Sequence, residues 1–244
     1  YTRLLWFFEG FTSYYDDLLL RRAGLLDNAG YLKLLNKTIN QVLQTPGRAV
    51  QTVAQASFDA WVKYYRQDEN TPNATVSYYT KGALVALCLD LTLRQEGHTT
   101  LDAVMRALWL RCKAGPMAEA DLLAVLAGLG GRDFTPELTD WVHGTADLPL
   151  EALLASQGVG VQEDAAQAAQ RLGLRVTETA GVQIKVVLRG GAAERAGFAA
   201  GDEWLAVETD PRKGDGWRLH KLDDLALYAG PQHKLTALVA RDKR

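Results

Sequence analysis

The chain has 244 residues, of which 48% are hydrophobic and 23% are charged, and its 27 basic and 29 acidic side chains give a formal net charge of -2. This composition is typical of one large or two ordinary globular domains and excludes a disordered or fibrous protein. No block of basic residues stands out, and the longest apolar run, which starts at Ala83, is interrupted by Asp90 well short of a membrane span. We therefore expect neither nucleic acid nor a membrane as a partner.

Two features concern the cellular setting of the chain. Cys88 and Cys112 each lie in an apolar helical pattern, so we interpret both as reduced core residues rather than a disulfide or a metal pair. The chain begins at Tyr1 without a methionine and enters a helix at once, so we expect a fragment or a processed product. Reduced cysteines fit a cytoplasmic location, which is our expectation for this chain.

Residues 1–157 follow the pattern of helices throughout. Apolar residues recur at helical spacing in the segments 6–22, 28–44, 52–65, 76–97, 99–115, 118–131 and 135–144. Gly24 follows two arginines as a helix stop, Thr100 or Thr99 is placed to cap a helix, and Thr135 followed by a proline predicts another helix start. The polar stretch 66–75, RQDENTPNAT, predicts a loop.

The pattern changes near residues 157–160. From Leu172 apolar and polar residues alternate, which places Val182, Ile184 and Val186 on one face of a strand, and Gly190 begins a turn. The remaining signals predict a short helix at 192–197, a strand ending at 208, a helix at 221–229 stopped by Gly-Pro, and a last strand at 234–240. We therefore expect a multidomain chain, with an all-α region at 1–157 and a small α/β domain at 158–244.

The order of signals in the second domain resembles a bacterial PDZ domain of the permuted type. The segment 196–207, AGFAAGDEWLAV, is similar to the AGL-x-x-GD block of that family. The resemblance implies a peptide-binding loop at Arg171, Leu172, Gly173 and Leu174 that offers backbone N–H groups to the C-terminal carboxylate of a peptide. The peptide would then add as a strand beside the helix at 221–229. In the alternative interpretation the glycines only shape turns, and the groove is empty or used internally.

Two motifs in the helical region belong together. The segment WFFEGFTSYYDDLLLRR contains Glu9, and the segment SYYTKGALVALCLDLTLR contains Tyr79. With the stretch 57–73 between them and the PDZ-like tail behind, they resemble the glycyl aminopeptidases, a family of zinc peptidases with a helical lobe and a C-terminal PDZ domain. More distantly, the first motif resembles the W-x-x-E-G-F of aminopeptidase N-like enzymes. The resemblance implies the helical half of a thermolysin-like catalytic domain at 1–157.

The resemblance also implies roles for individual residues. Glu9 would be the zinc-ligating carboxylate, and Tyr79 would donate a hydrogen bond to the oxyanion, with Tyr78 as the second choice. From the residues alone, two other interpretations stay open. A glutamate beside an apolar run is also typical of the first turn of a helix, where the helix dipole stabilises it, and a pair of tyrosines is also typical of a core edge.

One part of the family pattern is missing from this sequence. The H-E-x-x-H helix, which supplies two histidine ligands and the general base, does not occur, because none of His98, His143, His220 and His233 is followed by glutamate or has a partner four residues on. We therefore expect zinc in the intact parent protein, and neither catalytic zinc nor activity in this chain alone.

The sequence thus predicts the C-terminal part of a zinc-dependent aminopeptidase that removes small N-terminal residues such as glycine from peptides. Its PDZ domain would bind the C-termini of peptides or proteins. The alternatives are a non-catalytic peptide-binding or scaffold protein, and a processing protease that engages its substrates through the PDZ domain. The sequence upstream of this chain discriminates between the first two, because it either contains H-E-x-x-H or does not.

Overall fold

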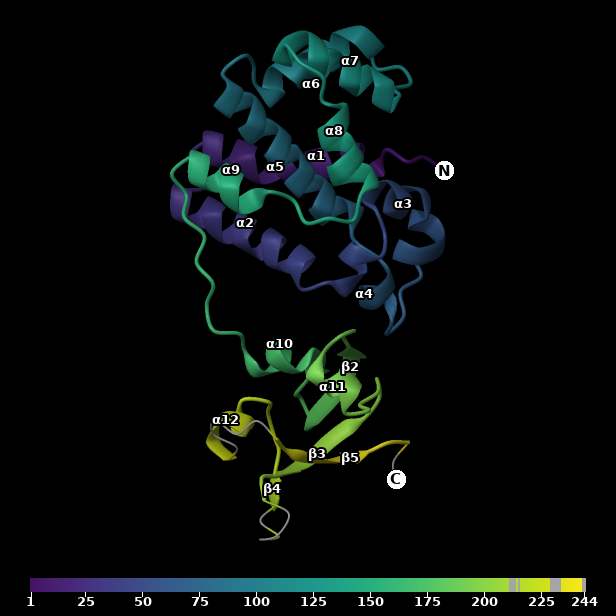
Figure 1. Ribbon diagram of the computed structural model, residues 1–244, viewed down its shortest axis with the longest axis vertical. Coiled ribbons are helices and arrows are strands. Elements are labelled where there is room, and N and C mark those ends of the chain that lie inside the picture. Colours follow the sequence, from purple (N-terminus) through teal and green to yellow (C-terminus); the bar gives the residue numbers. More distant parts are fainter. Residues whose placement is uncertain (211–213, 215, 229–233, 243–244) are drawn as a thin grey trace. The chain divides into compact units, whose positions relative to one another are not determined.

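The computed structural model describes residues 1–210, 214, 216–228 and 234–242 and divides into two compact units. The helical unit comprises residues 1–66 and 74–163, and the C-terminal unit comprises residues 67–73 and 164–244 (Figure 1). The predicted boundary lay at 157/158. The structure instead groups residues 158–163 with the helical unit and assigns the short segment 67–73 to the C-terminal unit.

The helical unit is built from α1, α2, α3, α5, α6, α7, α8 and α9 with three short turns of other helix types. The bounds of these helices are Leu5–Arg22, Asn28–Leu43, Val53–Phe58, Tyr78–Glu96, Leu101–Cys112, Glu119–Gly130, Thr135–Leu138 and Leu150–Ser156. The turns are the 3₁₀ helix η1 (Pro46–Ala49) and the π-helices η2 (Ala60–Tyr64) and η3 (Thr139–His143). None of the helices formed by the described residues is long and apolar enough to cross a membrane.

Local signals set several of these helix ends. Thr100 caps α6 as expected, since its side chain accepts a hydrogen bond from the N–H of Ala103. Three predictions were wrong in detail. The expected loop 66–75 contains the short helix α4 (Thr71–Ala74), and the segment 52–65 breaks into α3 and the π-helix η2. Thr135 does not cap α8, because the cap position is one residue earlier.

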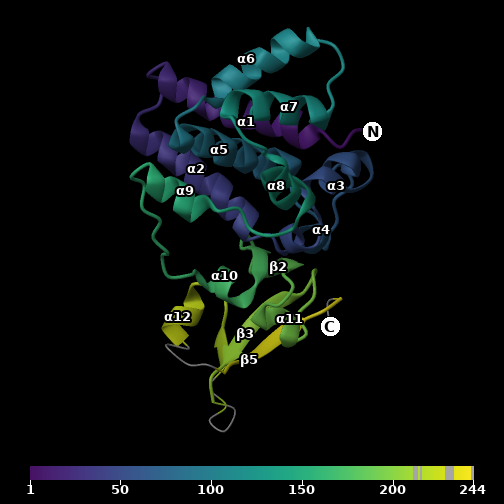
Figure 2. The same ribbon diagram turned by 45° about the horizontal axis from the view of Figure 1, so that its top comes forward.

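Helix α5 runs through the core of the helical unit and is buried along most of its length (Figure 2). The carboxylate that interrupts its apolar run, Asp90, is only 3% exposed. It accepts hydrogen bonds from the Tyr14 hydroxyl at 2.7 Å and from the N–H of Leu101, and it pairs with Arg94 at 2.9 Å. The charge is therefore compensated, and it ties α1 and the start of α6 to α5. Cys88, on the same helix, is buried and unpaired as expected.

From residue 164 on, the described residues of the C-terminal unit form an antiparallel sheet and three short helices. Its strands are β1 (Leu174–Thr177), β2 (Val182–Val187), β3 (Glu203–Glu208), β4 (Gly216–Arg218) and β5 (Thr236–Ala240). Its helices are α10 (Ala168–Leu172), α11 (Ala192–Arg195) and α12 (Asp224–Tyr228). The strands follow the order β1-β2-β3-β4, and β5 pairs with β3.

The sequence pattern of this unit is largely reproduced. Val182 and Ile184 are buried on one face of β2, as predicted, whereas Val186 is half-buried. Neither strand β4 nor helix α10 was predicted. Helix α12 is shorter than the predicted 221–229, and the Gly-Pro stop lies outside the described residues.

Two polar side chains fix the loops of this unit. Asp202 has a fully buried side chain that accepts two hydrogen bonds from Arg241, at 2.7 and 2.8 Å, and one from the N–H of Ala199. The amide of Asn73 donates to the carbonyl of Val187 at 2.8 Å and accepts from the N–H of Arg189 at 2.9 Å. These two bonds attach the segment 67–73 to the end of β2.

Candidate functional site

The site predicted from the two helical motifs is organised by the contact between α1 and α5. Gly10 of α1 faces Gly82 of α5 so closely that a Cβ on Gly10 would lie 2.5 Å from the backbone of Gly82. Only glycines allow this approach of two helix backbones. At the start of α1, the N–H of Trp6 donates to the hydroxyl of Ser57 at 2.9 Å, which ties α1 to α3. The position of Glu9 relative to α5 is therefore fixed by backbone packing.

Glu9 lies on α1 next to the glycine contact and is half-buried. Its backbone carbonyl accepts a hydrogen bond from Ser13, but among the described residues its carboxylate has no hydrogen-bond or ion-pair partner. The negative charge of this carboxylate acts on two tyrosines, since it contributes to raising the pKa of Tyr79 and opposes the lowering of the pKa of Tyr65. Glu9 is thus a carboxylate without a protein partner near the tyrosine of the second motif.

Three tyrosine hydroxyls meet at this site. Tyr78 is only 1% exposed, and its hydroxyl donates to that of Tyr65 at 3.3 Å. The hydroxyl of Tyr65 also lies 3.3 Å from that of Tyr79, which is half-buried. Of the two tyrosines in the second motif, Tyr79 is therefore the more accessible to a ligand. Tyr65 directly follows the π-helix η2, and sequence reasoning missed it; the local signal was the crowding of aromatic residues in AWVKYY.

Hydrogen bonding and burial shift the pKa values of these three tyrosines in different directions. The hydrogen bond with Tyr65, together with burial, raises the pKa of Tyr79 to about 12. The hydrogen bonds with Tyr78 and Tyr79 lower the pKa of the exposed Tyr65. Desolvation, with these bonds, raises the pKa of Tyr78. Tyr79 is consequently a neutral phenol at neutral pH and retains a proton that it can donate.

A complete metal site does not form among the described residues. No group of three His, Cys, Asp or Glu side chains gathers in residues 1–210, 214, 216–228 and 234–242. His98, His143 and His220 are exposed, and His143 bonds to Glu119 at 2.8 Å. His233 lies outside the described residues. Glu9 can supply one carboxylate ligand, so the described part of the chain does not fit a three-ligand zinc centre by itself.

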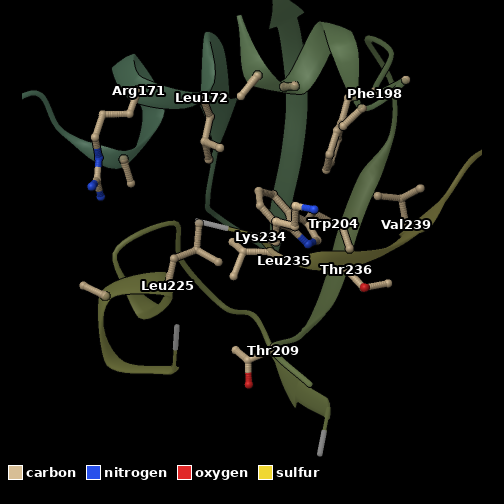
Figure 3. Close-up of a pocket in the computed structure, with 17 residues that line it drawn as sticks. Arg171, Leu172, Phe198, Trp204, Thr209, Leu225, Lys234, Leu235, Thr236 and Val239 are labelled. Carbon is tan, nitrogen blue, oxygen red and sulfur yellow. The ribbon is translucent and has the colours of Figure 1, made fainter. Parts of the chain in front are cut away.

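The C-terminal unit contains a separate cavity of about 1060 Å³. It opens between α10, α11, α12 and the strands β3 and β5, and Trp204 lies against it (Figure 3). Its lining is mostly apolar, and Arg171 and Lys234 are its two cationic residues among the described lining residues. The large apolar side chains that line it are Leu172, Phe198, Trp204, Leu225, Leu235 and Val239.

The four residues of the predicted peptide-binding loop are divided by the structure. Arg171 and Leu172 line the cavity, whereas Gly173 and Leu174 do not, and Leu174 is buried in the core. Arg171 and Leu172 also belong to the helix α10 rather than to a loop, and Gly173 ends this helix with φ +73°. The N–H groups of Arg171 and Gly173 already donate to the carbonyls of Gln167 and Gln170. These two N–H groups are therefore not free to receive a carboxylate.

The comparisons with known proteins bear on both units. Residues 1–85 match the model of the M61 glycyl aminopeptidase family. Over its whole length the chain is similar to the crystal structure of an aminopeptidase N family protein from Idiomarina loihiensis, with 33% sequence identity and a TM-score of 0.88. That match covers 100% of this chain and 44% of the other, so the chain spans less than half the length of this relative. No curated protein matches the chain.

The two matches agree with each other. The family match includes both Glu9 and the Y-T-K-G segment with Tyr79, and the structural match extends through the C-terminal unit. The chain is therefore similar to aminopeptidases in both units: residues 1–85 to the family model, and the whole chain to the solved structure.

Proposed function

We propose that this chain forms the C-terminal part of a zinc-dependent aminopeptidase that releases small N-terminal residues, such as glycine, from peptides. The observation that carries the proposal is that Glu9, a carboxylate with no hydrogen-bond partner among the described residues, lies close enough to Tyr79 and Tyr65 for its charge to act on the pKa of both. The family match over residues 1–85, which includes both residues, supports the interpretation of this arrangement as part of a peptidase site.

In the proposed enzyme, Glu9 is one ligand of the zinc, and the other ligands and the general base come from residues outside these 244. A zinc ion in such a site supplies Lewis-acid activation of water and of the peptide carbonyl. Tyr79 donates its proton in a hydrogen bond to the carbonyl oxygen as negative charge develops there. Its raised pKa, about 12, keeps that proton in place at neutral pH.

The chain alone is expected to be inactive, because it offers a single candidate ligand and no general base. Beside the tyrosines, the indole of Trp61 stacks on Tyr65 and is 63% exposed. Apolar surface of this kind often marks a contact with further protein.

The experiment compares this chain with the protein produced from its complete open reading frame. We expect the complete protein to bind about one zinc ion and to release glycine from a glycine anilide, and the 244-residue chain to do neither. Glu9→Gln in the complete protein should weaken zinc binding by at least about 100-fold, more than the loss of an outer-shell group does. Glu151→Gln, at an exposed glutamate of α9, is the matched control.

Two outcomes would contradict the proposal. If the complete protein binds no metal, the peptidase assignment is wrong, and non-catalytic peptide binding becomes the better-supported function. If the Glu9→Gln and Glu151→Gln variants bind zinc equally well, Glu9 is not a zinc ligand, although the protein can still be a zinc peptidase.

For the C-terminal unit we propose the binding of an apolar peptide end in the cavity beside Trp204. The apolar lining suits a large aliphatic or aromatic side chain, and the guanidinium of Arg171 suits the terminal carboxylate. This differs from the loop mode expected for a PDZ domain, because the charge of a side chain replaces free backbone N–H groups.

The tryptophan at the cavity provides a direct assay. A peptide that ends in leucine should change the fluorescence of the chain, and its amidated form should bind about tenfold more weakly because it lacks the carboxylate. Arg171→Gln should abolish the difference between the two peptides. Arg189→Gln, at an exposed arginine that does not line the cavity, should preserve it. Equal binding of both peptides by the unchanged chain would refute the role of Arg171.

A further inference from the structure

The hydroxyl of Tyr65 is the common partner of the two tyrosines of the Y-T-K-G motif. Tyr78 donates to it from the buried side at 3.3 Å, and Tyr79 lies 3.3 Å away on the accessible side. Tyr65 lies 14 residues before Tyr79 in the sequence and belongs to neither of the two sequence motifs. Its position therefore calls for an explanation of its own.

The ring of Tyr65 is held in place although the residue is 53% exposed. Trp61 stacks on it at 5.1 Å with an interplanar angle of 29°, and the ring of Tyr64 meets it edge-on at 5.4 Å and 86°. The N–H of Tyr65 donates to the carbonyl of Ala60 at 3.0 Å, five residues back. This π-helical turn inserts one extra residue, and such turns occur frequently at functional sites. Two ring contacts and one backbone bond thus fix an exposed phenol.

The donors and acceptors of the three hydroxyls define a chain of hydrogen bonds from the core to the accessible side. A phenol has one proton to donate and an oxygen that accepts. Since Tyr78 gives its proton to Tyr65, the oxygen of Tyr65 is anchored from the core, and its remaining capacity faces Tyr79. Both separations, 3.3 Å each, are longer than the usual O–H···O distance of about 2.7–2.8 Å, so both bonds are weak, and the one to Tyr79, on the accessible side, can be exchanged for a bond to a ligand.

We propose that Tyr65 is a positioning residue for Tyr79: it holds the Tyr79 hydroxyl where that hydroxyl donates to the carbonyl oxygen of a peptide. This inference rests on the proposed function of Tyr79. Tyr65 itself acts through Tyr79, with Tyr78 as its anchor in the core and Trp61 as the support of its ring.

The first test uses the 244-residue chain without metal and records the NMR chemical shift of the Cζ carbon of each tyrosine. Tyr78→Phe and Tyr79→Phe identify the two signals of interest. Tyr65→Phe keeps the ring, and with it the ring contacts, but removes the hydroxyl, so we expect it to shift the signals of both Tyr78 and Tyr79. The control is Tyr31→Phe, which removes a hydroxyl on α2 outside the trio and should leave both signals in place. An unchanged Tyr79 signal in the Tyr65→Phe chain would overturn the proposal.

The second test measures peptide hydrolysis by the complete protein. Tyr65→Phe should lower kcat about tenfold, as expected for one neutral hydrogen bond, and leave KM within about twofold. Tyr31→Phe should leave both constants unchanged. If Tyr79→Phe lowers kcat and Tyr65→Phe does not, the positioning role is wrong while the proposed function stands. If Tyr79→Phe leaves kcat unchanged as well, the role of Tyr79 fails and the positioning role fails with it.

Discussion

The contact between Gly10 of α1 and Gly82 of α5 makes a quantitative prediction for Gly10→Ala. The added Cβ would lie 2.5 Å from two backbone atoms of Gly82, whereas non-bonded carbon atoms prefer about 3.5–4.0 Å. Backbone atoms cannot rotate away, so the helices must separate by about 1 Å. Overpacking of this kind costs up to about 3 kcal/mol. Alanine in a helix regains about 1 kcal/mol over glycine, which leaves a net loss of about 2 kcal/mol.

The control is Gly128→Ala, on the exposed side of α7. A Cβ at Gly128 meets no atom within 4 Å, so only the helix propensity changes, and the variant should be more stable by up to about 1 kcal/mol. Urea unfolding followed by far-UV circular dichroism reports mainly on the helical unit and compares the two variants with the unchanged chain. The same stabilisation by Gly10→Ala as by Gly128→Ala would refute the close contact, and with it our account of how Glu9 is placed beside Tyr79.

Three further predictions concern polar residues outside the tyrosine site. Asp90→Ala should lower the free energy of unfolding by about 2 kcal/mol in urea titrations, because it removes a buried acceptor that Arg94 also pairs with; a loss below about 0.5 kcal/mol would contradict this. Arg241 and the N–H of residue 199 lower the pKa of Asp202 in the folded state. The ionised Asp202 therefore stabilises the folded state above about pH 4, and this stabilisation is lost as the pH falls through the lowered pKa. The melting temperature of Asp202→Asn should therefore fall less steeply on acidification than that of the unchanged chain, and equal slopes would argue against this role. Asn73→Ala should destabilise the C-terminal unit by about 1–2 kcal/mol through two lost backbone hydrogen bonds, as seen in its urea midpoint; an unchanged midpoint would show that the segment 67–73 does not support this unit.

The amino-acid sequence by itself determined where most helices and strands form. Helical spacing of apolar residues located α1, α2, α5, α6 and α7, and alternation located β2 and β3. These patterns can be read from the sequence because helix and strand periodicity involves residues that are close in the chain. The same is true of helix caps such as Thr100. The two motifs with Glu9 and Tyr79 were also readable, because each is a short contiguous segment, and the family match over residues 1–85 covers the first motif and the Y-T-K-G part of the second.

Tertiary structure alone decided which of these residues meet. Glu9 and Tyr79 are brought to one site by the backbone contact between Gly10 and Gly82, and no periodicity encodes a contact across more than 70 positions. The same holds for Tyr65, which follows a π-helical turn and whose hydroxyl lies 3.3 Å from that of Tyr79. It also holds at the predicted peptide-binding loop, where the end of α10 uses two of the expected N–H donors for its own carbonyls. Long-range packing and the competition for backbone hydrogen bonds are settled only when the whole chain has folded.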